Sequence, residues 1–133
     1  MDDLVITPSV LEKAKQHIED ALIKAGVHTV LLIDDAGNVV ANCGRSGSSF
    51  DTTALAALAA ANFGATSQIA RLIGEEDFTL LFHRGKKDSI HFAKVGNRLI
   101  LITIFGEEIS LGLVRLRVAQ LTKIIEKIFN LDN

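Results

Sequence analysis

The 133-residue chain has one cysteine, one proline and no long hydrophobic run. Cys43 has no internal partner for a disulfide, and with four scattered histidines it gives no spacing typical of a zinc site. The longest apolar stretches, 54–61 and 99–105, fall far short of the roughly 20 residues that span a membrane. The amino terminus lacks the features of a secretory signal. These absences predict a cytoplasmic protein with no membrane insertion, no metal and no cofactor.

Neither sign of charge dominates. Fourteen Lys and Arg residues against 16 Asp and Glu give a formal net charge of -2, which argues against nucleic acid as a partner. The glycines lie mostly between periodic segments, so no linker divides the chain. With 48% hydrophobic residues, the composition predicts one folded domain over residues 1–133.

Apolar residues at helical spacing predict three helices. The first begins either at Thr7 with Pro8 or at a capping box of Ser9 and Glu12, and it ends at Gly26. The second follows the N-cap Asp51, spans 52–73 and is rich in alanine. The third follows Ser110, and its apolar stripe comprises Leu111, Val114, Val118, Leu121, Ile125 and Ile128.

Five β-branched or alternating segments predict strands, at 29–33, 39–43, 78–84, 90–95 and 98–105. Turn residues join them as a hairpin and a three-stranded meander. Both faces of the last strand are apolar, so this strand should be central and covered twice. The expected fold class is therefore α+β, a five-stranded antiparallel sheet with helices on both faces, in the order α-β-β-α-β-β-β-α.

The middle helix has one face without charge and a second face with almost none. The face predicted to pack on the sheet comprises Leu55, Leu58, Ala59, Asn62, Thr66, Ile69 and Ile73. On the remaining arc, small residues four apart leave a shallow groove. We expect this arc to bind a partner through Ala56, Ala57, Ala60, Gly64, Ser67, Gln68 and Arg71. Alternatively, alanine only favours the helix, and the arc contacts the protein's own fold.

Four segments carry a family resemblance. They are Leu32-Ile33-Asp34 with Gly37, Leu58-Ala59-Ala60-Ala61-Asn62, Ile104-Phe105, and Ser110-Leu111-Gly112-Leu113-Val114-Arg115. Together they resemble the roadblock / dynein light chain family, and within it the bacterial gliding-protein MglB branch. The resemblance implies a three-layer roadblock-like fold. It also implies a homodimer in which the strand after the long helix pairs with its twin and the two long helices lie side by side.

The strand after the long helix has an apolar edge. Phe78, Leu80 and Phe82 alternate along it, and an unpaired edge of this kind invites pairing. The resemblance places the dimer axis there. The predicted dimer interface consists of Phe78, Thr79, Leu80, Leu81, Phe82, His83 and Ala61.

The resemblance further implies that the dimer binds a small Ras-like GTPase through the middle helix and, as a GTPase-activating protein of the MglB branch, stimulates GTP hydrolysis by that partner. The sequence contains no P-loop, and His83 and His91, which could face one another on neighbouring strands, have no nucleophile beside them. We therefore expect a regulator without catalytic residues of its own. The alternatives are a structural scaffold subunit of a motility, polarity or trafficking complex, with no effect on GTP turnover, and, with less support, a small-molecule sensor.

Overall fold

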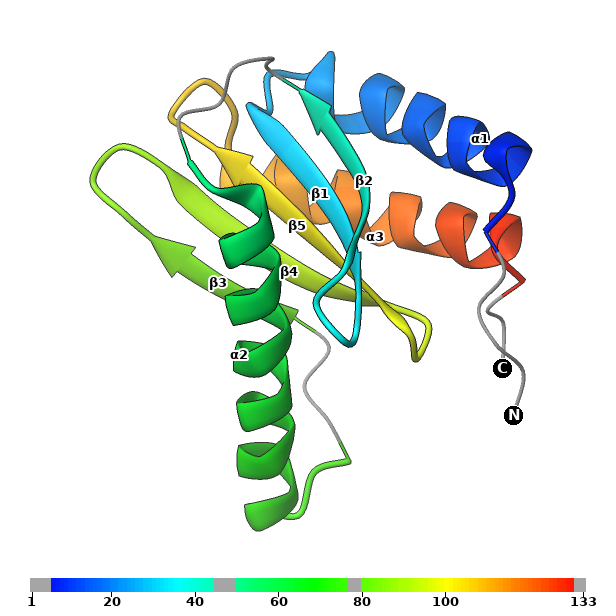
Figure 1. The fold of residues 1–133 in the computed structure, drawn as a ribbon. Coiled ribbons are helices and arrows are strands. Elements are labelled where there is room, and N and C mark those ends of the chain that lie inside the picture. Colours follow the sequence, from blue (N-terminus) through cyan, green and yellow to red (C-terminus); the bar gives the residue numbers. More distant parts are fainter. Residues whose placement is uncertain (1–5, 45–49, 77–79, 131–133) are drawn as a thin grey trace.

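The computed structural model describes residues 6–44, 50–76 and 80–130. Five strands form one antiparallel sheet in the order β2-β1-β5-β4-β3 (Figure 1). Their bounds are β1 Thr29–Asp34, β2 Val39–Gly44, β3 Leu80–Arg84, β4 Ser89–Val95 and β5 Leu99–Phe105. The predicted fold class and order of elements are confirmed.

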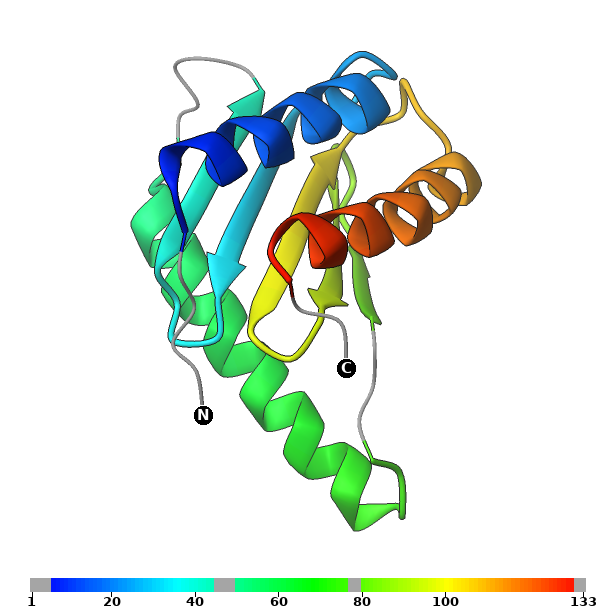
Figure 2. The same ribbon diagram turned by 90° about the vertical axis from the view of Figure 1, so that its right-hand side faces the viewer.

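Helices cover both faces of the sheet. Figure 2 shows α1 (Pro8–Ile18) and α3 (Leu111–Ile128) on one face, and α2 (Thr52–Leu72) lies on the other. The carboxyl-terminal part of α2 extends beyond the sheet in both views (Figures 1 and 2). Part of this helix therefore has no sheet beneath it.

Each of these helices begins at a side-chain cap. Thr7 Oγ1 accepts a hydrogen bond from the Val10 amide at 3.2 Å, with Pro8 next in the chain, so the first of the two predicted starts is the correct one. Asp51 caps α2 through the Ala54 amide at 3.1 Å. Ser110 caps α3 in the same way, as predicted.

Strand β5 lies at the centre of the sheet, between β1 and β4. Leu99, Leu101 and Phe105 pack in the core under α1 and α3. Ile100 and Ile102 pack in a second core that includes residues of α2. The strand is thus covered twice, as its two apolar faces predict.

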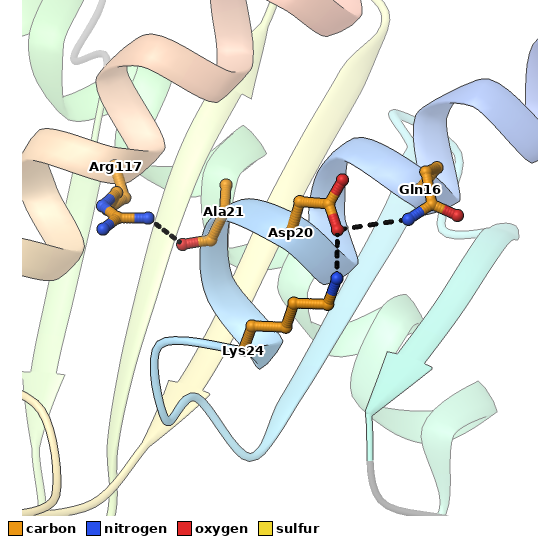
Figure 3. Close-up of polar contacts among 5 residues, drawn as sticks. All are labelled: Gln16, Asp20, Ala21, Lys24 and Arg117. Carbon is orange, nitrogen blue, oxygen red and sulfur yellow. Dashed lines mark hydrogen bonds and ion pairs between the residues drawn. The ribbon is translucent and has the colours of Figure 1, made fainter.

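The first helix changes into one π-helical turn, η1 (Glu19–Ile23), before the chain enters β1. The carbonyl of Ala21 in this turn accepts a hydrogen bond from Arg117 of α3 at 3.1 Å (Figure 3). Asp20 of this turn pairs with Lys24, the residue that follows the turn, at 2.8 Å. The Arg117 guanidinium therefore ties α3 to the end of the first helix.

Candidate functional site

The orientation of α2 on the sheet differs from the one predicted. Its buried residues are Ala56, Ala59, Phe63 and Ala70. Of the face predicted to pack on the sheet, only Ala59 is among them. Leu58 and Ile69 of that face are 69% and 53% exposed. The predicted orientation is therefore wrong.

Small side chains explain the observed orientation, because they let the backbone of α2 come close to the sheet. A Cβ atom on Gly37, in the β1–β2 turn with φ 92°, would lie 3.1 Å from the Cα atom of Ala57. Further along the helix, Phe63 meets Phe92 of β4 edge to face, with ring centroids 6.2 Å apart. Close approach at the alanines leaves the larger aliphatic side chains pointing away from the sheet.

Three of these larger side chains and two alanines form an outward stripe, which we define as Leu58, Ala61, Ala65, Ile69 and Leu72. All five are exposed, and Leu72 reaches 86%. They recur at spacings of three and four, so they share one face of the helix. Ala65 and Leu72 are in neither of the two predicted faces of the helix, although their spacing from Leu58 and Ile69 is the signal that could have placed them. An apolar stripe of this length on a single helix is typical of a protein–protein contact.

An apolar groove lies between the first half of α2 and the β3–β4 hairpin. Its volume is about 660 Å³. The apolar lining residues are Phe50, Ala54, Leu55, Leu58, Ile90 and Ile104, and His83 also lines it. The groove shares Leu58 with the outward stripe, so the two apolar surfaces are continuous.

Strand β3 is an edge strand that pairs with β4 alone among the described strands. Of the predicted dimer residues, Leu81 and Phe82 are half-buried, whereas His83 and Ala61 are exposed. Leu80 begins the strand. Phe78 and Thr79 lie outside the described residues. The outer edge of β3 offers backbone donors and acceptors to another strand.

A polar cleft of about 220 Å³ lies on the other flank of α2, next to the β1–β2 and β4–β5 turns. Among the residues that line it are Asp35, Ala60, Gly64, Ser67, Arg71, Asn97 and Arg98. A Cβ atom on Gly64 would meet nothing within 4 Å. The two flanks of α2 therefore differ in chemistry, one apolar and one charged.

The residues predicted to bind a partner fall into three groups. Ala57, Gly64, Gln68 and Arg71 are exposed, and Ala60 and Ser67 are half-buried beside the polar cleft. Ala56 is fully buried, because this alanine packs against the sheet. Its side chain cannot reach a partner, which corrects the predicted set at that position.

The two histidines of the meander do not face one another. The register pairs His83 with Ile90 and Phe82 with His91, so the two imidazoles lie on opposite faces of the sheet. Within residues 6–44, 50–76 and 80–130, no group of three or more His, Cys, Asp or Glu is placed to hold a metal ion. None of the helices in that part of the chain is long and apolar enough to cross a membrane.

The sequence profile of the Roadblock/LC7 domain matches residues 13–105. The chain belongs to the Roadblock/LC7 family. This Roadblock/LC7 protein is 37% identical to MglB of Myxococcus xanthus, whose structure it matches with a TM-score of 0.86 over 96% of this chain and 95% of that one. The resemblance seen in the sequence is thereby confirmed.

Two further MglB structures resemble this Roadblock/LC7 protein. The gliding protein MglB of Thermus thermophilus is 28% identical, with a TM-score of 0.87 over 98% of each chain. A structure described as MglB with tetrameric arrangement is also 28% identical, with a TM-score of 0.89 over 98% of this chain and 97% of that one. Comparison with curated proteins yields no significant match.

Proposed function

We propose that this Roadblock/LC7 protein is a homodimeric adaptor that binds a small Ras-like GTPase and regulates its GTP hydrolysis. The observation that carries the proposal is the exposure of α2, which presents an apolar stripe on one side and a charged cleft on the other. Two surfaces of different chemistry on one helix fit two different partners. Membership of the family and the 37% identity to an MglB support it.

A second copy of the chain suits the apolar side. Its β3 would supply a backbone partner for the free edge of β3, and its α2 would cover the outward stripe. Both contacts join like surfaces, as a two-fold axis requires. The relative described as having a tetrameric arrangement supports self-association.

The charged flank of α2 suits the GTPase. Gly64, Gln68 and Arg71 are exposed there, and Arg71 and Arg98 line the cleft beside them. Polar surfaces of this kind are usual in contacts that form and dissociate. Docking on this flank would favour one arrangement of the GTPase switch segments and so align that protein's own catalytic groups. No catalytic residue of this chain is needed.

The test is GTP hydrolysis by a Ras-like GTPase from the same cells, measured with and without this protein. A faster rate supports the regulator. Binding without a change in rate would favour a structural scaffold. Absence of binding would contradict the proposal.

The site on α2 is tested by Gly64→Arg, with Gly112→Arg in α3 as the matched control. Both glycines are exposed in helices, and a Cβ atom on either meets nothing within 4 Å. Both variants should unfold at the same temperature as the unmodified protein or a higher one, because arginine favours helix over glycine. Only Gly64→Arg should weaken GTPase binding, by about tenfold or more. Full-strength binding by Gly64→Arg would refute the site.

A further inference from the structure

A separate cavity lies on the face of the sheet opposite α2, between α3 and β4. Its volume is about 290 Å³. Ala93, Val118 and Ala119 give it an apolar lining. Arg115, Lys94 and Lys123 line it as well, and no acidic side chain is among the described residues that line it. The cavity is therefore apolar in its walls and positive in charge.

His91 lines this cavity with both ring nitrogens unpaired. The residue is 2% exposed, and neither Nδ1 nor Nε2 has a hydrogen-bond partner among the described residues. Thr103 of β5 lies opposite His91 in the sheet and is fully buried. Its Oγ1 atom also has no hydrogen-bond partner among the described residues. Buried polar side chains usually have a partner, because the loss of their hydration is otherwise uncompensated. An exception at a residue that lines a cavity points to a bound group there.

The charges around His91 indicate the sign of that group. Burial and then the positive charge of Arg115 lower the pKa of the imidazole, which is therefore neutral near pH 7. Lys94 and Lys123 add positive charge at the same cavity. The cross-strand neighbours Phe82 and Thr103 carry no charge. If His91 took up a proton, its positive charge would be repelled by that of Arg115. A bound anion would offset this repulsion.

We propose that this cavity binds a small organic carboxylate. The carboxylate group would pair with Arg115 and accept a hydrogen bond from His91, and a short hydrocarbon chain would lie against Ala93, Val118 and Ala119. The apolar walls favour such a molecule over inorganic phosphate. Because α2 lies on the opposite face of the sheet, the site does not depend on the proposed GTPase surface.

The probe is butyrate, titrated into the full-length protein while the imidazole resonances of His91 are followed by NMR. We expect a saturable shift, with affinity that rises by up to about tenfold per pH unit on acidification, because one proton is taken up with the anion. Butanol and inorganic phosphate serve as comparison probes, since one lacks the charge and the other lacks the hydrocarbon chain. Neither should reach the affinity of butyrate.

Arg115→Gln tests the site without disturbing the core, because Arg115 is exposed. It should weaken butyrate binding by about tenfold, whereas Lys127→Gln, which removes one charge from the same helix away from the cavity, should leave it unchanged. Equal effects of the two variants would overturn the site. The absence of a shift with butyrate, or phosphate binding as tight as that of butyrate, would overturn the proposed ligand.

Discussion

Gly44, at the end of β2, lies against the backbone that leads into β1. Its φ is 118°, and a Cβ atom there would overlap the carbonyl oxygen of His28 and lie 2.9 Å from the Cα atom of Thr29. Gly74, after α2, has φ 87°, but a Cβ atom there would meet nothing within 4 Å. The two positions share the left-handed backbone and differ in the space around it.

Gly44→Ala should therefore destabilise the protein more than Gly74→Ala does. The left-handed backbone costs an alanine about 1–2 kcal/mol at either position. Gly44→Ala carries a further cost, because backbone atoms must move. The free energies of unfolding in urea give the comparison. Equal values for the two variants would show that the close approach at Gly44 is not a constraint.

His91 makes stability depend on pH. Its pKa is lowered in the fold, by burial and then by Arg115, from the ordinary histidine value of 6.5. Below about pH 6.5 the unfolded chain takes up a proton that the folded protein does not. The free energy of unfolding therefore decreases as the pH is lowered, until the pH reaches the lowered pKa of the folded protein. His91→Leu should remove this part of the slope and keep stability at pH 7.5. Urea unfolding at about pH 7.5 and about pH 5.5 gives the free energy of unfolding of both proteins. The same pH dependence in His91→Leu and in the unmodified protein would show that His91 is not its source.

At the scale of the helices, Arg117 joins α3 to the π-helical turn through the carbonyl of Ala21. Arg117→Gln should destabilise the fold by about 1–3 kcal/mol, because a half-buried carbonyl loses its charged donor. Arg115→Gln is the control, since that exposed arginine lies two residues away on the same helix. Thermal unfolding of the two variants makes the comparison. Equal stability would mean that the contact contributes nothing.

The sequence was sufficient to predict the elements but not the orientation of α2. Caps such as Asp51 and Ser110, and the two apolar faces of β5, act through residues close in the chain, so local patterns identified them. The orientation of α2 depends on how closely alanines approach a sheet and on Phe63 meeting Phe92, which are contacts between distant segments. The apolar groove and the polar cleft could not be predicted for the same reason.

At the scale of the molecule, the two faces of the sheet are covered unequally. In the described part of the chain, two helices cover one face and α2 alone lies on the other, with its end beyond the sheet (Figure 2). The outward stripe, the apolar groove and the edge of β3 are left on that side. We propose that a second copy of the chain covers all three surfaces.

The most direct test is the mass of the protein in solution by sedimentation equilibrium. The unmodified protein should have twice the chain mass of 14.4 kDa. Leu58→Glu with Ile69→Glu should be a folded monomer, because both side chains are exposed and charges on paired stripes repel. Leu116→Glu with Ile124→Glu, at exposed positions of α3, should remain a dimer. An unmodified protein that is monomeric at all concentrations, or a dimer that survives the α2 substitutions, would show that these surfaces do not form the dimer interface.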